Sequence, residues 1–137
     1  MEDQAGTKGP ADPDPHRGKG YRPSPERVAD AICEDLLAIH RDSYGGSAQG
    51  ASATFVGDTL VVLLDAIELL PGEELLIAND RADAVAMLRS EYQRAIEPAF
   101  RAAVERATGR SVLSFTGHVQ VEQEPRFAVE IFSLEPA

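Results

Sequence analysis

Apolar residues recur at helical spacing in two long segments of the chain. The first segment carries its apolar side chains three or four positions apart, at Val28, Ile32, Leu36 and Ile39. Ser24 is a good N-cap and Pro25 suits the first helical position. The pattern therefore predicts a helix that ends near Ser43, where Gly45 or Gly46 can take the left-handed conformation that closes many helices.

The second helical segment is longer and contains a proline. We expect it to run from Asp80, a candidate N-cap, to Ala107, with Gly109 ending it. Its apolar stripe consists of Val85, Leu88, Tyr92, Ile96, Phe100, Ala103 and Val104. Because the stripe continues beyond Pro98, the pattern predicts a kink near residues 94–97 and not a break.

Two pairs of apolar segments predict β-hairpins. The first pair lies within residues 51–65 and turns at Gly57-Asp58, and the second spans 111–121 and 126–134. Pro71 opens a short helix that we expect over 72–78. The order α-β-β-α-β-β predicts an α+β two-layer sandwich, in which a four-stranded, largely antiparallel sheet has its main helices on one face.

The predicted strands are apolar on both sides. In the last strand one side carries Phe127, Val129 and Ile131, and the other carries Ala128, Phe132 and Leu134. Helices on one face cannot cover both sides, and large exposed apolar patches are rare in monomers. We therefore expect a homodimer through the sheet, because two-fold dimers are the commonest oligomers. Glu130 is expected at the rim, where its charge stays hydrated.

The first 23 residues differ from the rest in composition. They are rich in Pro and Gly and almost free of apolar residues, which predicts a disordered tail before a single domain over 24–137. The tail has as many basic as acidic side chains, so the domain carries the whole net charge of −10. An acidic body disfavours binding to nucleic acid or to an anionic lipid surface.

Compartment and membrane insertion are also constrained by the sequence. The longest aliphatic run, Leu60 to Leu64, is far too short to insert into a bilayer, and no apolar leader is evident at the N-terminus. The one cysteine, Cys33, excludes an intrachain disulfide and is expected to be a small buried residue. We expect a cytoplasmic protein.

His40 and Tyr44 lie one turn apart near the end of the first helix, beside a glycine-rich linker over 45–50. They predict either a ligand or proton-handling site at the mouth of that loop, or a structural pair. In the structural interpretation, which we favour, charged His40 complements the helix dipole and Tyr44 packs on the first strand. A phosphate cradle is disfavoured because this loop leads into a strand and not into a helix.

Other polar residues form no recognisable chemical motif. The closing hairpin carries His118, Glu122, Glu124 and Glu130, but their spacing matches no known metal site. The sequence offers no arrangement of a nucleophile with a base. We therefore expect no metal, no cofactor and no enzymatic activity.

Several short motifs follow one another in a characteristic order. A His and a Tyr-Gly precede two apolar strands; an acidic short helix, a Val-x-x-x-Arg-x-x-aromatic pattern, a Thr-Gly-Arg turn and a closing Phe-x-Leu follow. In this chain they are His40, Tyr44-Gly45, Glu73-Glu74, Val85, Arg89, Tyr92, Thr108-Gly109-Arg110 and Phe132-Ser133-Leu134. Together they resemble the MpsC-like family, a small bacterial family described with a sodium-translocating, membrane-potential-generating system.

The resemblance implies a non-enzymatic accessory or assembly protein of a sodium-dependent transport system, with an integral-membrane transporter subunit as partner. It points to ligand- or partner-binding residues at His40, Tyr44, Gly45, Gly46, Arg89 and Arg110. The alternative is a small-ligand or anion sensor that uses the 44–50 loop with His40 and Arg89. By their residue types alone, Arg89 is expected to pair with Asp83 or a residue near Glu91, and Arg110 to complement a helix end.

The chain departs from the family pattern at two places. The family's Gly-Arg-Gly-Pro turn lacks its Arg and Pro here, where Gly46, Ser47 and Ala48 stand. An anion or partner contact made by that Arg would be lost or relocated. Leu70 stands where a capping Ser or Thr is usual, so the short helix is expected to fray.

Overall fold

The computed structural model describes residues 23–46 and 48–137, so the tail expected over 1–23 lies outside the described residues except for Pro23. The chain forms α1 (Pro25–Tyr44), β1 (Ala48–Val56), β2 (Thr59–Ile67), α2 (Pro71–Ala78), α3 (Ala82–Thr108), β3 (Val112–Gln120) and β4 (Phe127–Leu134). This order confirms the predicted α-β-β-α-β-β layout and the short helix between its halves.

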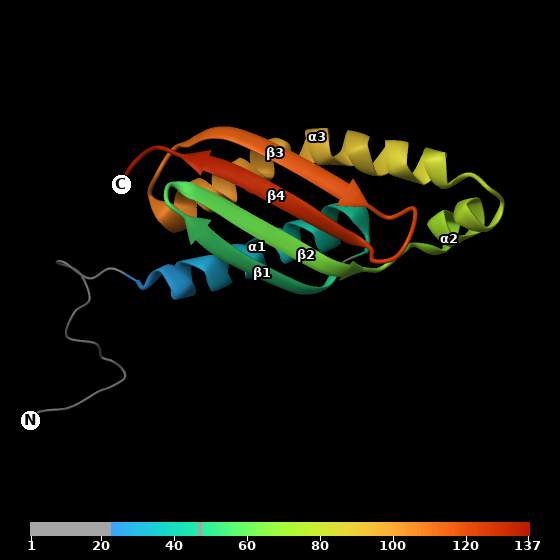
Figure 1. The fold of residues 1–137 in the computed structure, drawn as a ribbon, viewed down its shortest axis with the longest axis horizontal. Helices are drawn as coiled ribbons and strands as arrows, with labels where there is room; N and C mark the ends of the chain where they lie inside the picture. Colours follow the sequence, from blue (N-terminus) through green and yellow to red (C-terminus); the bar gives the residue numbers. More distant parts are fainter. Residues whose placement is uncertain (1–22, 47) are drawn as a thin grey trace, which may run out of the picture.

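The four strands form one antiparallel sheet in the order β1-β2-β4-β3. Each hairpin pairs its own two strands, and β2 and β4 join the hairpins at the centre of the sheet. The helices α1 and α3 pack against each other, α1 over β1 and α3 over β3, and both lie on the same side of the sheet (Figure 1). The predicted α+β class is therefore confirmed.

The core lies between the sheet and these two helices. The central strands point alternate side chains into it, so the apolar residues of one face are buried as the pleat requires. Its fully buried large side chains include Ile32, Leu36, Leu60, Val62, Phe100, Val104 and Phe132. Cys33 is buried against the same core, as the sequence predicted.

The bounds of α1 follow its end signals. Ser24 accepts a hydrogen bond from the Arg27 amide, and Gly45 closes the helix in the left-handed conformation with φ of 94°. The next strand begins earlier than expected, because Ala48 already pairs with Ile67. The predicted flexible linker over 45–50 is therefore wrong: its second half is paired sheet, and strand hydrogen bonds override its glycine-rich composition.

The start of α3 differs from the prediction. Asp80 has φ of 62°, which turns the chain into α3 and prevents it from acting as the N-cap, and Arg81 takes that place without a side-chain hydrogen bond. Leu88, assigned to the apolar stripe, is 53% exposed, whereas Arg89 is 1% exposed. The helix continues without interruption through Pro98, as the unbroken stripe predicted.

The sheet face away from the helices carries an apolar strip along its two central strands. Val61 pairs with Ile131 and Leu63 with Val129, and these four side chains form what we call the open-face patch. All four are at least partly exposed. Glu130 does not rim this patch as expected: it is 1% exposed and lies on the opposite, helix-facing side. The alternation of β4, which places Glu130 between Val129 and Ile131, requires this orientation.

Candidate functional site

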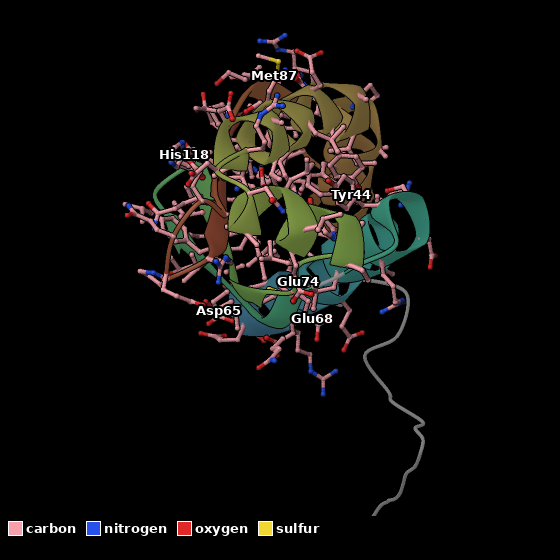
Figure 2. The ribbon with its side chains drawn as sticks, turned by 90° about the vertical axis from the view of Figure 1, so that its right-hand side faces the viewer. Tyr44, Asp65, Glu68, Glu74, Met87 and His118 are labelled. Atoms are coloured by element: carbon pink, nitrogen blue, oxygen red, sulfur yellow. The ribbon has the colours of Figure 1, made fainter. Side chains whose placement is uncertain are left out.

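Most of the predicted site residues meet where the three helices converge. His40 and Tyr44 come from the last turn of α1, and Arg89 comes from α3. Figure 2 looks onto this end of the molecule, with α2 in front and Tyr44 labelled near the meeting point of the helices. Arg110 is not part of this group, because it follows α3 at the opposite end of the sheet (Figure 1).

The centre of the group is a buried ion pair between Arg89 and Glu73. Arg89 Nε donates to Glu73 Oε2 and Nη2 donates to Oε1, both at 2.7 Å, which is a bidentate arrangement. The two side chains are 2% and 4% exposed. The predicted pairing of Arg89 with Asp83 or a residue near Glu91 is therefore wrong. Asp83 and Glu91 themselves are exposed, and they pair with Arg81 and Arg94 respectively.

Glu73 also accepts two further hydrogen bonds. Tyr44 Oη donates to Oε2 at 2.6 Å and the Leu70 amide donates to Oε1 at 2.8 Å. Burial raises the pKa of Glu73, but the hydrogen bonds from Arg89, Tyr44 and Leu70 outweigh it and hold that pKa below its ordinary value. Glu73 thus binds the N-cap amide of α2, which begins at Pro71, but no side chain takes the place of the Ser or Thr, because Leu70 makes no side-chain cap bond.

Tyr44 covers the ion pair with its ring. The Arg89 guanidinium lies over the ring at 4.3 Å from its centroid, a cation–π contact. Burial, together with the hydrogen bond to Glu73, raises the pKa of Tyr44 to about 12, so its hydroxyl stays a donor. The interpretation that Tyr44 packs on the first strand is therefore replaced: it packs on α3 and binds α2.

His40 is buried and does not act as a charged helix cap. Burial lowers the pKa of His40, although the hydrogen bond to the Gly46 carbonyl opposes this. Its Nδ1–H donates to Gly46 O at 2.8 Å, and its ring contacts both Tyr44 and Tyr92. A neutral imidazole adds no charge to the helix end, so the dipole interpretation is wrong. His40 instead anchors the chain that leaves α1.

The two glycines of the predicted site have conformational and steric roles. Gly45 supplies the left-handed residue that ends α1. A Cβ at Gly46 would lie 3.0 Å from Leu70 Cδ2, so a side chain there would push against the segment that enters α2. Gly45 therefore lets the chain turn at the end of α1, and Gly46 lets it pass close to the segment that enters α2.

Arg110 connects two turns at the other end of the sheet. Its Nη2 donates to Asp58 Oδ1 at 2.5 Å and its Nε donates to the Glu135 carbonyl at 2.8 Å. Asp58 belongs to the turn between β1 and β2. Arg110 therefore ties that turn to the C-terminal end of the chain, a role that the dipole argument did not anticipate.

The polar residues of the closing hairpin do not converge. His118, Glu122 and Glu124 are exposed, and Glu130 is buried on the helix side (Figure 2 labels His118). Within the described ranges 23–46 and 48–137, no three His, Cys, Asp or Glu side chains are grouped closely enough to hold a metal ion.

The group formed by His40, Tyr44, Glu73, Arg89 and Tyr92, which we call the polar cluster, joins three helices. The two Glu73 oxygens accept four hydrogen bonds between them, so the carboxylate is occupied by internal donors. Sequence reasoning named three members as site residues and missed Glu73 and Tyr92. The available signal was the spacing of Leu70 and Glu73. A Glu three positions after the N-cap residue can accept a hydrogen bond from the N-cap amide.

Comparison with known proteins gives one match. The family model described as "Na+-translocating membrane potential-generating system (MpsC)" matches residues 25–135, which is most of the chain and spans all seven elements. Neither the curated proteins nor the solved structures contain a match to this chain. Of the helices in the described part of the chain, none combines the length and the apolar character needed to cross a membrane.

Proposed function

Because this chain belongs to the MpsC family, we propose that it is a non-enzymatic accessory or assembly protein of a sodium-translocating, membrane-potential-generating system. In this role it acts from the cytoplasm on an integral-membrane transporter subunit. The observation that carries the proposal beyond the family's description is the open-face patch. It is apolar and partly exposed, in a chain whose net charge is −10. Such a surface suits docking onto another chain, either a second copy of this protein or the transporter subunit.

The polar cluster supports a structural role for the residues that resemble a site. Arg89 and Glu73 are almost fully buried and bind each other, and Tyr44 covers them. An incoming anion at Arg89 would have to displace the bidentate carboxylate of Glu73. The geometry therefore favours a rigid scaffold that presents its sheet face, over an anion sensor built on the 44–50 segment.

A deletion strain tests the role in ion transport. Membrane vesicles from cells that lack the protein are expected to build a smaller sodium-dependent potential, measured with a potential-sensitive dye, and the wild-type chain should restore it. A variant with Ile131 replaced by Glu should fail to restore it, whereas Met87→Glu, on the exposed side of α3, should succeed. An unchanged potential in the deletion strain contradicts the proposal.

We also propose that the open-face patch mediates a homodimer. Thr54, Thr116 and His118 lie beside the patch by strand register, so much of its rim is polar, and the exposed acid Asp65 follows Leu63 on the same face at one end of the patch. Light scattering at micromolar concentration is expected to give about twice the 14.7 kDa chain mass. Ile131→Glu should give a monomer and Met87→Glu a dimer. A strictly monomeric wild type would instead assign the patch to a different partner.

The sensor alternative has its own test. A ligand present at about 100 times its dissociation constant would raise the free energy of unfolding by roughly 2.7 kcal/mol. Thermal-shift measurements with sodium and a metabolite set would detect this change. A flat response would remove the alternative.

A further inference from the structure

Glu130 is a buried acid whose neighbours on the sheet are apolar. It is 1% exposed and points from β4 towards the helices, in line with buried Ala128 and Phe132. Its β2 neighbour is buried Val62 and its β3 neighbour is Gly117. Among the described residues no Arg, Lys or His forms an ion pair with it. An ionised carboxylate in such a place is strongly destabilised.

Its polar partner is Gln93 of α3. Gln93 Nε2 donates to Glu130 Oε2 at 3.1 Å. The remaining oxygens of this pair, Glu130 Oε1 and Gln93 Oε1, are both buried and have no hydrogen-bond donor among the described residues. Both oxygens lie beside Gly117. A Cβ atom added at Gly117 would be 2.7 Å from Glu130 Oε1 and 3.0 Å from Gln93 Oε1. Two acceptor oxygens left together without a donor repel each other and lack the bonds that buried polar atoms normally make.

We propose that Glu130 is a proton-binding site of this domain. In this site Glu130 Oε1 carries the proton and donates a hydrogen bond to Gln93 Oε1. The proton satisfies both orphan oxygens at once. With the Nε2–H bond to Glu130 Oε2 it closes a reciprocal acid–amide pair, in which each group donates once and accepts once. Gly117 makes room for the pair, because any side chain at that position would meet both oxygens. The proposal does not depend on the accessory role.

The site has access to solvent. Gln93 and Gly117 also line a groove of about 300 Å³ between α3 and the edge strand β3, together with Ser90, Arg94, Phe115 and His118. On its inner side, Glu130 faces a cavity of about 10 Å³, close to the space of one water molecule, which it shares with His40 and Arg89 of the polar cluster. Protons therefore have a short path between bulk water and the pair.

The charged and titratable groups around Glu130 do not neutralise it. From α3, Arg89 is paired with Glu73 through Nε and Nη2, while its buried Nη1 has no hydrogen-bond partner among the described residues. Arg94 and Glu97 lie in the groove, and Tyr92 stays protonated because burial raises its pKa. From α1, His40 is kept neutral by its lowered pKa, and from β3, His118 is exposed and lies opposite Val129, on the sheet face away from Glu130. Burial raises the pKa of Glu130 to about 8, against the hydrogen bond from Gln93. The proton is therefore held at neutral pH and released under mildly alkaline conditions.

Nuclear magnetic resonance of the side-chain carboxyl carbons tests the site directly in the wild-type chain. The Glu130 carbon, assigned through its own backbone and confirmed by its absence in Glu130→Gln, is expected to titrate with a midpoint near pH 8. The titration is run in sodium chloride and in potassium chloride at equal ionic strength. Equal midpoints support a proton site. A midpoint at or below the ordinary value of 4.5 overturns it, and a midpoint lowered by sodium alone overturns it in favour of a sodium site.

Unfolding measurements provide a second test. The folded state holds the Glu130 proton up to about pH 8, while the unfolded state releases it near 4.5. The unfolding constant of the wild type relative to Glu130→Gln should therefore rise about tenfold per pH unit between these values and level off above them. Glu135→Gln, in an exposed position near the C-terminus, should leave the wild-type profile unchanged. A constant ratio between wild type and Glu130→Gln would overturn the proposal.

Discussion

Replacing Arg89 by methionine is expected to lower the free energy of unfolding by about 3–5 kcal/mol. The substitution leaves the Glu73 carboxylate, which is 4% exposed, without its cation and without two hydrogen bonds. It also removes the group on which the Tyr44 ring packs. Denaturant unfolding followed by circular dichroism measures the change. A loss below about 1 kcal/mol would mean that Glu73 finds another partner or becomes hydrated.

Two further variants separate the buried pair from ordinary surface charge. Arg94 forms an exposed pair with Glu91 at 3.0 Å, so Arg94→Met is expected to cost less than about 1 kcal/mol. Replacing Arg89 and Glu73 together by methionine removes both charges, and the double variant should be more stable than Arg89→Met alone. A double variant that is less stable than Arg89→Met would show that Glu73 contributes mainly through its bonds to Tyr44 and Leu70.

The ion pair also has a defined pH dependence. Because the pKa of Glu73 is lower in the folded state than its ordinary value of 4.5, its contribution to stability is fully present above that value. The contribution is lost as the pH falls through the lowered pKa. The difference in unfolding free energy between wild type and Arg89→Met should therefore become smaller as the pH falls below the lowered pKa of Glu73.

The elements of the fold could be predicted because their signals are local. Ser24, Pro25 and Gly45 define the ends of α1 through bonds made within a few residues of each other. The hairpins follow from short apolar segments that flank a turn, as at Gly57-Asp58. The early start of β1 could not be predicted in this way, because the pairing of Ala48 with Ile67 depends on the position of a distant segment.

The polar cluster was only partly predictable for the same reason. His40 and Tyr44 are one turn apart, so their proximity follows from helix geometry. The pairing of Arg89 with Glu73 joins two helices and no short-range pattern encodes it. The apolar pattern also assigned Leu88 and not Arg89 to the core. A pattern of apolar residues cannot identify a charged side chain that is buried because a partner neutralises it. Glu130 was misplaced by the same assumption, that an acid seeks water.

Phe100→Ala is expected to cost about 3–5 kcal/mol, because it would leave a large cavity in the centre of the core. Phe100 is 1% exposed and meets the Phe115 ring edge to face, with the centroids 6.5 Å apart. It stands two residues after Pro98, so its burial depends on the continuation of α3 beyond the proline. The sequence predicted this position from the apolar stripe that crosses Pro98.

Met87→Ala is the matched control for this measurement. Met87 lies on the same helix and is 69% exposed, so its truncation should change the free energy of unfolding by less than about 0.5 kcal/mol. Both variants are compared with wild type in one denaturant series, in which an unchanged slope shows that the folded state is still intact. Similar small losses for the two variants would mean that the helix after Pro98 does not pack on the sheet, and that the core ends before β3.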